Sequence, residues 1–404
     1  MQAKRIIIVV TVGLLLIAAL FTIINWNDLT EKGVGGFFYD VFHPDEVLAL
    51  DETVFHSEDR DVYAYGVYKD TIIYAGQQGI SGMNLKAEWL WDETAVSFLN
   101  PYIKNSGEYT VVAELDGQWV FLFQKNVLVW KTELQGTIIS VDVNSMGYVA
   151  VAHTLENYNG AITVFSPTAQ ADGSATALFV NKLSQETVIA AVLSPDSQQM
   201  TISSISTENE VMTGSFRFVN LEDGNTYASL QCEENVYPLC WYVDNETVIA
   251  ANGNSVRKLT RRKTAGTELD HNMELWTGKY ATQSIYAACV VDNAYIVIAS
   301  GNGSQGIYSQ NEETNITILT LEGEVVLEFK VSGIVSRLDA GTGIFAVGLQ
   351  HAVSFYQLDG TKLYDYETAY EIQKTIIINK KNFFVATPKE AYILTAKPMN
   401  EIVE

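Results

Sequence analysis

The chain has 404 residues, of which 48% are hydrophobic and 18% are charged. This composition supports a large buried core and excludes a disordered chain. The formal net charge of −23 disfavours nucleic acid as a partner, because a phosphate-binding surface needs clustered basic residues.

Near the amino terminus, residues 6–24 form an apolar run without a single charge. At about 1.5 Å per residue, a helix of this length nearly spans the ~30 Å hydrocarbon core of a bilayer. No Ala-x-Ala cleavage site follows, which favours an uncleaved signal-anchor over a secretory signal peptide. Lys4 and Arg5 precede the run, so the positive-inside rule places the amino terminus in the cytoplasm.

These features predict a single-pass protein of the cytoplasmic membrane whose globular part lies outside. The expected layout is a cytoplasmic tip at residues 1–5, a transmembrane helix at 6–25, an extracytoplasmic tether at 26–51, a globular domain at 52–397 and a tail at 398–404.

The rest of the chain is organised by a β-repeat. Eight times, an apolar alternating strand is followed by an Asp or Asn and then by a second strand. The acidic or amide residues, which we interpret as hairpin corners, are Asp70, Asn105, Asn144, Asp196, Asp244, Asp292, Asp339 and Asn379. Repeats of about 40 to 50 residues with four short strands are typical of a β-propeller, because no single repeat can bury its own hydrophobic face.

We therefore predict an all-β, eight-bladed β-propeller, with seven blades as the alternative count. The last repeat has room for only three strands before the chain ends. The short segment 53–56, between the anchor and the first repeat, is the candidate for the missing outermost strand. Such closure would protect an edge that otherwise invites aggregation.

Three segments between the second and third strands of a repeat are longer than a hairpin requires, namely residues 153–160, 204–214 and 301–314. Long loops on a rigid scaffold often carry function, so we predict a binding rim there. The candidate residues are Glu156, Asn157, Tyr158, Glu208, Asn209, Glu210, Asn302, Gln305, Tyr308 and Glu312.

One local cluster of basic residues stands out in this acidic chain: Arg257, Lys258, Arg261, Arg262 and Lys263. A solvated strand face is one interpretation. The other is contact with anionic lipid headgroups, which attract such groups by ~1 kcal/mol each.

No motif predicts a catalytic centre, a metal site or a cofactor. The five histidines lack metal-ligand spacing, and the glycines at 301, 303 and 306 are followed by a polar loop and a strand, not by the helix that a dinucleotide site needs. Cys232, Cys240 and Cys289 form no disulfide framework and are expected to be buried, with a Cys232–Cys240 bridge left open.

The segment Leu358-Asp359-Gly360-Thr361-Lys362-Leu363-Tyr364 resembles the quinoprotein-like and WD40-like repeats of known propellers. Trp91, Trp130 and Trp276 occupy the positions of the tryptophan that docks adjacent blades in the quinoprotein type. The whole layout, one anchor and one divergent propeller, resembles a family of membrane-anchored propeller proteins of Gram-positive bacteria with no assigned activity. That resemblance implies architecture and location.

Our leading interpretation is a non-enzymatic binding or assembly scaffold for a protein or cell-envelope ligand. The alternative is a divergent propeller enzyme, a quinoprotein-like oxidoreductase or a hydrolase, with its site at the axial channel. An enzyme predicts clustered ionisable groups beside a drug-sized pocket in the channel, whereas a scaffold predicts an apolar plug.

Overall fold

The computed structural model describes residues 48–56, 62–93, 96–206, 212–232, 235–261, 269–278, 283–302 and 313–398. The predicted cytoplasmic tip, transmembrane helix and most of the tether lie outside these residues. Within them, no helical segment has the length and apolarity that a membrane crossing requires.

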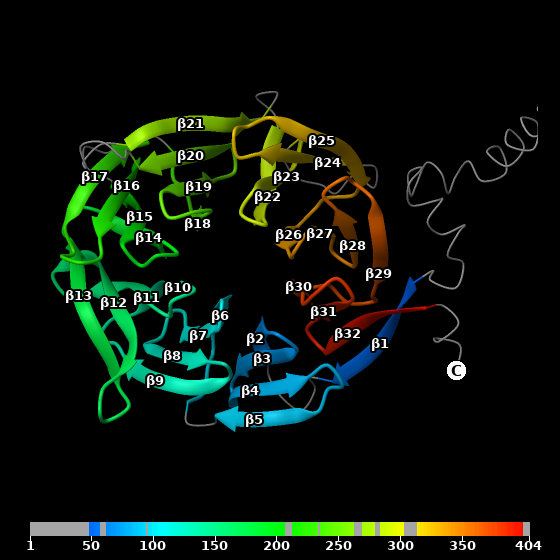
Figure 1. Ribbon diagram of the computed structural model, residues 1–404, viewed down its shortest axis with the longest axis horizontal. Helices are drawn as coiled ribbons and strands as arrows, with labels where there is room; N and C mark the ends of the chain where they lie inside the picture. Colours follow the sequence, from blue (N-terminus) through cyan, green and yellow to red (C-terminus); the bar gives the residue numbers. More distant parts are fainter. Residues whose placement is uncertain are drawn as a thin grey trace, which may run out of the picture.

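The described strands form eight four-stranded antiparallel sheets arranged as blades around a central axis (Figure 1). The prediction of an all-β, eight-bladed β-propeller is thereby confirmed. In blades 1 to 7 the strands run from the innermost to the outermost in chain order. Each blade therefore connects to the next from its outer edge back to the axis.

The first four blades follow one another along the chain. Blade 1 contains β2 (Val62–Tyr68), β3 (Thr71–Gly76), β4 (Gly79–Asn84) and β5 (Trp89–Glu93). Blade 2 contains β6 (Pro101–Ser106), β7 (Tyr109–Glu114), β8 (Trp119–Gln124) and β9 (Val127–Glu133). Blade 3 contains β10 (Ile138–Val143), β11 (Val149–Leu155), β12 (Tyr158–Ala169) and β13 (Ala175–Leu183). Blade 4 contains β14 (Thr187–Leu193), β15 (Gln199–Ser206), β16 (Thr213–Asn220) and β17 (Thr226–Gln231).

The remaining blades complete the ring. Blade 5 contains β18 (Leu239–Tyr242), β19 (Thr247–Ala251), β20 (Ser255–Arg261) and β21 (Leu269–Thr277). Blade 6 contains β22 (Gln283–Val291), β23 (Tyr295–Asn302), β24 (Glu313–Thr320) and β25 (Val325–Ser332). Blade 7 contains β26 (Arg337–Ala340), β27 (Ile344–Gly348), β28 (Ala352–Gln357) and β29 (Lys362–Glu367). Blade 8 contains β30 (Lys374–Ile377), β31 (Asn382–Ala386), β32 (Glu390–Pro398) and, outermost, β1 (Leu48–His56).

Strand β1 joins the two ends of the described chain. It pairs with β32 in an antiparallel register that runs from Leu48 opposite Pro398 to His56 opposite Glu390. The strand contains the segment 53–56 but begins earlier than the sequence suggested, so the last residues assigned to the tether are strand. Leu50 explains the extension, because its side chain packs against the hydrophobic cluster between blades 7 and 8.

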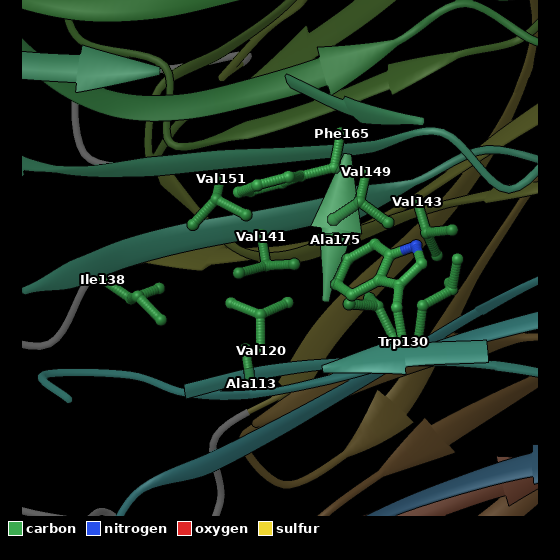
Figure 2. Close-up of a cluster of buried hydrophobic side chains, with 12 residues drawn as sticks. Ala113, Val120, Trp130, Ile138, Val141, Val143, Val149, Val151, Phe165 and Ala175 are labelled. Carbon is green, nitrogen blue, oxygen red and sulfur yellow. The ribbon is translucent and has the colours of Figure 1, made fainter. Parts of the chain in front are cut away.

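The hydrophobic core is divided among the junctions between blades. Each junction holds one cluster, made from facing surfaces of two adjacent blades. Figure 2 shows the cluster between blades 2 and 3, in which Trp130 of β9 lies against residues of blade 3. Because both faces of a blade are covered, central strands such as β27 are buried along their whole length and do not alternate.

All three predicted tryptophans lie at the junction with the next blade, and Trp276 of blade 5 is 8% exposed within the cluster shared with blade 6. Trp130 is 1% exposed, and its indole N–H donates to the carbonyl of Ser166 in blade 3 at 3.0 Å. Trp91 of blade 1 stacks on Phe123 of blade 2 with ring centroids 5.4 Å apart. These contacts explain why large aromatic residues recur on the outermost strands.

Six of the eight predicted corner residues lie in or beside the turn between the first and second strands, but Asn105 and Asp339 do not. Asn105 lies inside β6 and Asp339 inside β26. The turns come later in both blades, where Gly107 (φ 57°) and Gly343 (φ 68°) adopt the left-handed conformation that glycine accommodates most easily.

Several corner side chains also connect neighbouring blades. The Asn144 amide donates to the Ser194 carbonyl at 2.9 Å and to the Ser197 hydroxyl at 2.7 Å. The Asn105 carbonyl oxygen accepts from the backbone N–H of Val67 at 3.1 Å. At these two positions the repeated Asp or Asn therefore bridges two blades.

Candidate functional site

The ring has two edges with different connections. We call the edge that carries the connections between second and third strands the outward rim, and the edge with the turns between first and second strands the corner rim. The long connections in the sequence predict ligand binding on the outward rim.

The first of the three predicted rim loops is shorter than expected. Most of residues 153–160 is strand, and only Glu156 and Asn157 form the turn between β11 and β12. Asn157 supplies a positive φ of 66°, which allows this tight turn. His153 is buried in β11, where Nε2 lies 2.8 Å from the Thr163 hydroxyl, so it supports the blade and is not exposed to ligands.

The predicted rim residues are distributed over three blades. Glu156, Asn157 and Tyr158 are exposed at the tip of blade 3, and the Tyr158 ring lies 5.1 Å from the Lys182 ammonium. Asn302 is exposed at the end of β23. The other rim candidates lie outside the described residues: Glu208, Asn209, Glu210, Gln305, Tyr308 and Glu312.

A cavity of about 370 Å³ opens on the outward rim at blade 6. Among the predicted rim residues that the structure describes, Asn302 lines it. The structure adds Gln283, Tyr286, Asn315 and other residues from the rim ends of β22, β24 and β25. The sequence alone does not reveal these residues, because they come from separate strands and no local motif connects them.

The axial channel contains a second cavity, of about 490 Å³, lined by innermost strands from five blades. Its wall carries Lys104, Asp339 and Lys374 together with apolar residues such as Ile103 and Ile376. The channel therefore corresponds neither to a fully apolar plug nor to an uninterrupted cluster of ionisable groups.

The charges on one side of the channel are satisfied within the protein. Lys104 of β6 forms a salt bridge with Asp142 of β10, and the other Asp142 carboxylate oxygen accepts from the Leu193 N–H at 2.7 Å. Burial opposes the charge of Lys104, but Asp142 outweighs burial and holds the Lys104 pKa above its ordinary value. This pair connects blades 2, 3 and 4 around the axis.

Asp339, on the opposite side, is less well satisfied. Lys374 Nζ lies 4.0 Å from one Asp339 carboxylate oxygen, and the other oxygen is buried without a hydrogen-bond partner. Burial raises the pKa of Asp339, although the positive charges of Lys374 and Arg337 oppose the shift.

The three cysteines are free and buried, so Cys232 and Cys240 form no bridge. Burial raises the pKa of the Cys240 thiol to about 12, and Cys232 and Cys289 shift in the same direction for the same reason. All three are therefore protonated packing residues at neutral pH.

The described part of the basic cluster packs against neighbouring blades. The Arg257 and Arg261 guanidiniums lie 5.4 and 4.6 Å from the ring centroids of Tyr237 and Tyr227. Lys258 Nζ lies 3.3 Å from the Glu322 carboxylate of blade 6. Arg262 and Lys263 are outside the described residues.

The fold defines the chain as an eight-bladed β-propeller. Residues 49–394 match the family of unknown function DUF5711, and the chain belongs to that family. No curated protein sequence matches the chain significantly.

Similar solved structures share the fold at low sequence identity. Sqt1 of Chaetomium thermophilum, solved bound to the N-terminus of the ribosomal protein L10, is 11% identical with a TM-score of 0.56; the match covers 85% of this chain and 98% of Sqt1. The C-terminal WD40 domain of Sif2 is 12% identical with a TM-score of 0.57, over 86% and 99% of the two chains. The quinohemoprotein alcohol dehydrogenase of Comamonas testosteroni is 8% identical with a TM-score of 0.58, over 87% and 76%.

Proposed function

We propose that this protein is a membrane-anchored scaffold, held on the outer face of the cytoplasmic membrane, that binds a protein or cell-envelope ligand through its outward rim. The observation that carries the proposal is the contrast between rim and channel. The rim cavity at blade 6 presents polar side chains to solvent, whereas Lys104 and Asp142 in the channel neutralise each other.

The path of β1 supports the proposed orientation. Its first residue, Leu48, pairs with Pro398 at the corner rim, and its last residue, His56, pairs with Glu390 near the outward rim. An anchor that precedes Leu48 would hold the corner rim toward the membrane. The outward rim would then face away from the bilayer, where ligands can reach it.

A propeller of similar fold has been solved with a protein partner. Sqt1 was solved with the N-terminus of the ribosomal protein L10, so a ring of this fold can receive a segment of another protein. An enzymatic site in the channel is not favoured. Of the charged groups in its wall, Lys104 forms a salt bridge with Asp142, and Asp339 lies 4.0 Å from Lys374.

The test is site-specific photo-cross-linking in intact cells. A photoreactive residue replaces Glu156 on the outward rim and, as the control, Glu222 on the corner rim, both exposed turn residues. We expect a defined adduct from position 156 and none from position 222. Adducts of equal yield from both positions, or none from either, would contradict a rim-directed scaffold.

A second measurement tests location. Glu156→Cys should react with a membrane-impermeant maleimide in intact cells, because the proposed orientation places it outside and away from the bilayer. Protection of this residue until the cells are lysed would place the propeller inside and refute the orientation.

A further inference from the structure

Three amide side chains line the rim cavity of blade 6. Gln283 begins β22, Asn302 ends β23 and Asn315 lies near the start of β24, and all three line the cavity. Among the described residues, none of these three side chains makes a hydrogen bond. Each side-chain amide therefore offers both a donor and an acceptor to a ligand.

A β-bulge places an aromatic ring beside these amides. The pairing of β22 with β23 skips Tyr286, between Ile285 and Ala287, and bulges commonly redirect a side chain. Tyr286 lines the cavity and lies over Gly301, where an added Cβ would come within 2.6 Å of the Tyr286 hydroxyl. The absence of a side chain at position 301 makes room for the ring.

The rest of the wall is fixed and carries no net charge. Glu313 and Lys330 form a salt bridge at 2.6 Å, so their charges cancel. The Thr314 hydroxyl donates to the Gly333 carbonyl at 2.7 Å and accepts from the Val335 N–H at 3.2 Å. These bonds hold the start of β24 against the connection to blade 7.

We propose that this cavity binds a neutral saccharide. Sugar hydroxyls both donate and accept hydrogen bonds, as the three amides do, and a sugar ring can lie on an aromatic face such as that of Tyr286. The volume of about 370 Å³ is within the range of small-ligand sites. The paired charges select neither a cationic nor an anionic ligand.

A protein partner fits this cavity less well. Energetically dominant contacts at protein interfaces involve buried aromatic or apolar anchors, whereas the described wall has Ile334 and the Tyr286 ring as its larger apolar groups and is otherwise lined mainly by polar residues. The inference rests on the proposed function, since it identifies a carbohydrate of the cell envelope as the ligand class of the same rim.

The test uses the full chain in mild detergent with maltotriose, cellotriose and chitotriose as probes. Saturation-transfer NMR should detect binding of at least one of them, and calorimetry gives its affinity. Asn302→Ala and Asn315→Ala each remove one neutral hydrogen-bonding group, which should weaken binding about 3- to 10-fold. Gly301→Ala should displace Tyr286 and abolish binding.

The matched control is Asn254→Ala, an exposed amide in the turn between β19 and β20 that does not line the cavity. It should bind the saccharide as the unmodified chain does. All variants are first checked for an unchanged thermal transition. If Gly301→Ala fails this check, the two amide variants carry the test.

Absence of saturation transfer from all three probes would overturn the inference, and so would equal weakening by Asn254→Ala. Binding of a peptide partner that Asn302→Ala and Asn315→Ala weaken instead would also overturn it. In each of these three cases, a cross-link from position 156 would still support the proposed scaffold function. Loss of both the saccharide signal and that cross-link would remove the proposed function as well.

Discussion

Truncation of Trp130 should reveal how strongly the blades depend on their docking aromatics. Trp130→Ala removes a side chain that is 1% exposed and that donates to the Ser166 carbonyl across the junction between blades 2 and 3. Burial of this kind typically contributes about 3 to 5 kcal/mol, measured as the loss on truncation to Ala. The Ser166 carbonyl would also lose its donor.

The size of the thermal shift follows from the length of the domain. The family match covers residues 49–394, which is 346 residues. At about 2.1 cal/mol/K per residue, the entropy of unfolding is about 0.7 kcal/mol/K. Trp130→Ala should therefore lower Tm by about 4 to 7 °C, as measured by differential scanning calorimetry.

Two further variants separate the contribution of the Trp130 hydrogen bond from that of its burial between blades. Trp130→Phe keeps most of the buried ring but removes the hydrogen bond, which is worth about 0.5 to 1.5 kcal/mol, so Tm should fall by about 1 to 2 °C. Trp89→Ala truncates a tryptophan that is 40% exposed and touches Tyr74 edge to face. This variant should lower Tm by no more than Trp130→Phe does. If Trp89→Ala and Trp130→Ala lower Tm equally, the argument that interblade docking stabilises the ring is refuted.

Three further predictions concern the axis, the corners and the closing strand. Because burial raises the pKa of Asp339, the folded state holds its proton more tightly, and stability falls as pH rises through that pKa. Asp339→Asn should therefore raise Tm at pH 7 but not below pH ~3.8, in paired thermal scans; a gain that persists below that pH would contradict the reasoning. Asn144→Ala removes two hydrogen bonds to blade 4, so the free energy of unfolding, measured in urea, should fall by about 1 to 3 kcal/mol. The control is Asn379→Ala, because the Asn379 side-chain carbonyl accepts hydrogen bonds within its own corner. This control should lower the free energy of unfolding by less. Deletion of residues 1–56 removes β1 and exposes the edge of β32, so light scattering should detect self-association that deletion of residues 1–47 does not cause.

Much of the fold could be predicted because each blade repeats the same local chemistry. Alternating apolar strands and polar turn residues recur often enough to count eight blades from sequence. Two corners were misplaced because a later glycine, Gly107 or Gly343, provides a better turn than the Asn or Asp before it. The loop at residues 153–160 was misjudged because the strands on both sides continue to Leu155 and from Tyr158.

The candidate site was less accessible to sequence reasoning. Asn302 could be identified from its place beside a long insertion. Gln283 and Asn315 could not, because amides on separate strands become neighbours only through the pairing of β22, β23 and β24. Tyr286 also depends on a bulge, and single-residue shifts in strand register leave no clear signature in composition.

The pairing of β1 with β32 also determines the order in which the protein can be completed during translation. Leu48 is made early, but its partner Pro398 follows 350 residues later. At about 5 to 20 residues per second, the ribosome needs roughly 20 to 70 seconds to synthesise that interval. Blades 1 to 7 can assemble one after another in that time, while β1 waits unpaired. The final junction therefore forms only after nearly the whole chain has emerged, and β1 is the described strand that stays without its partner for longest.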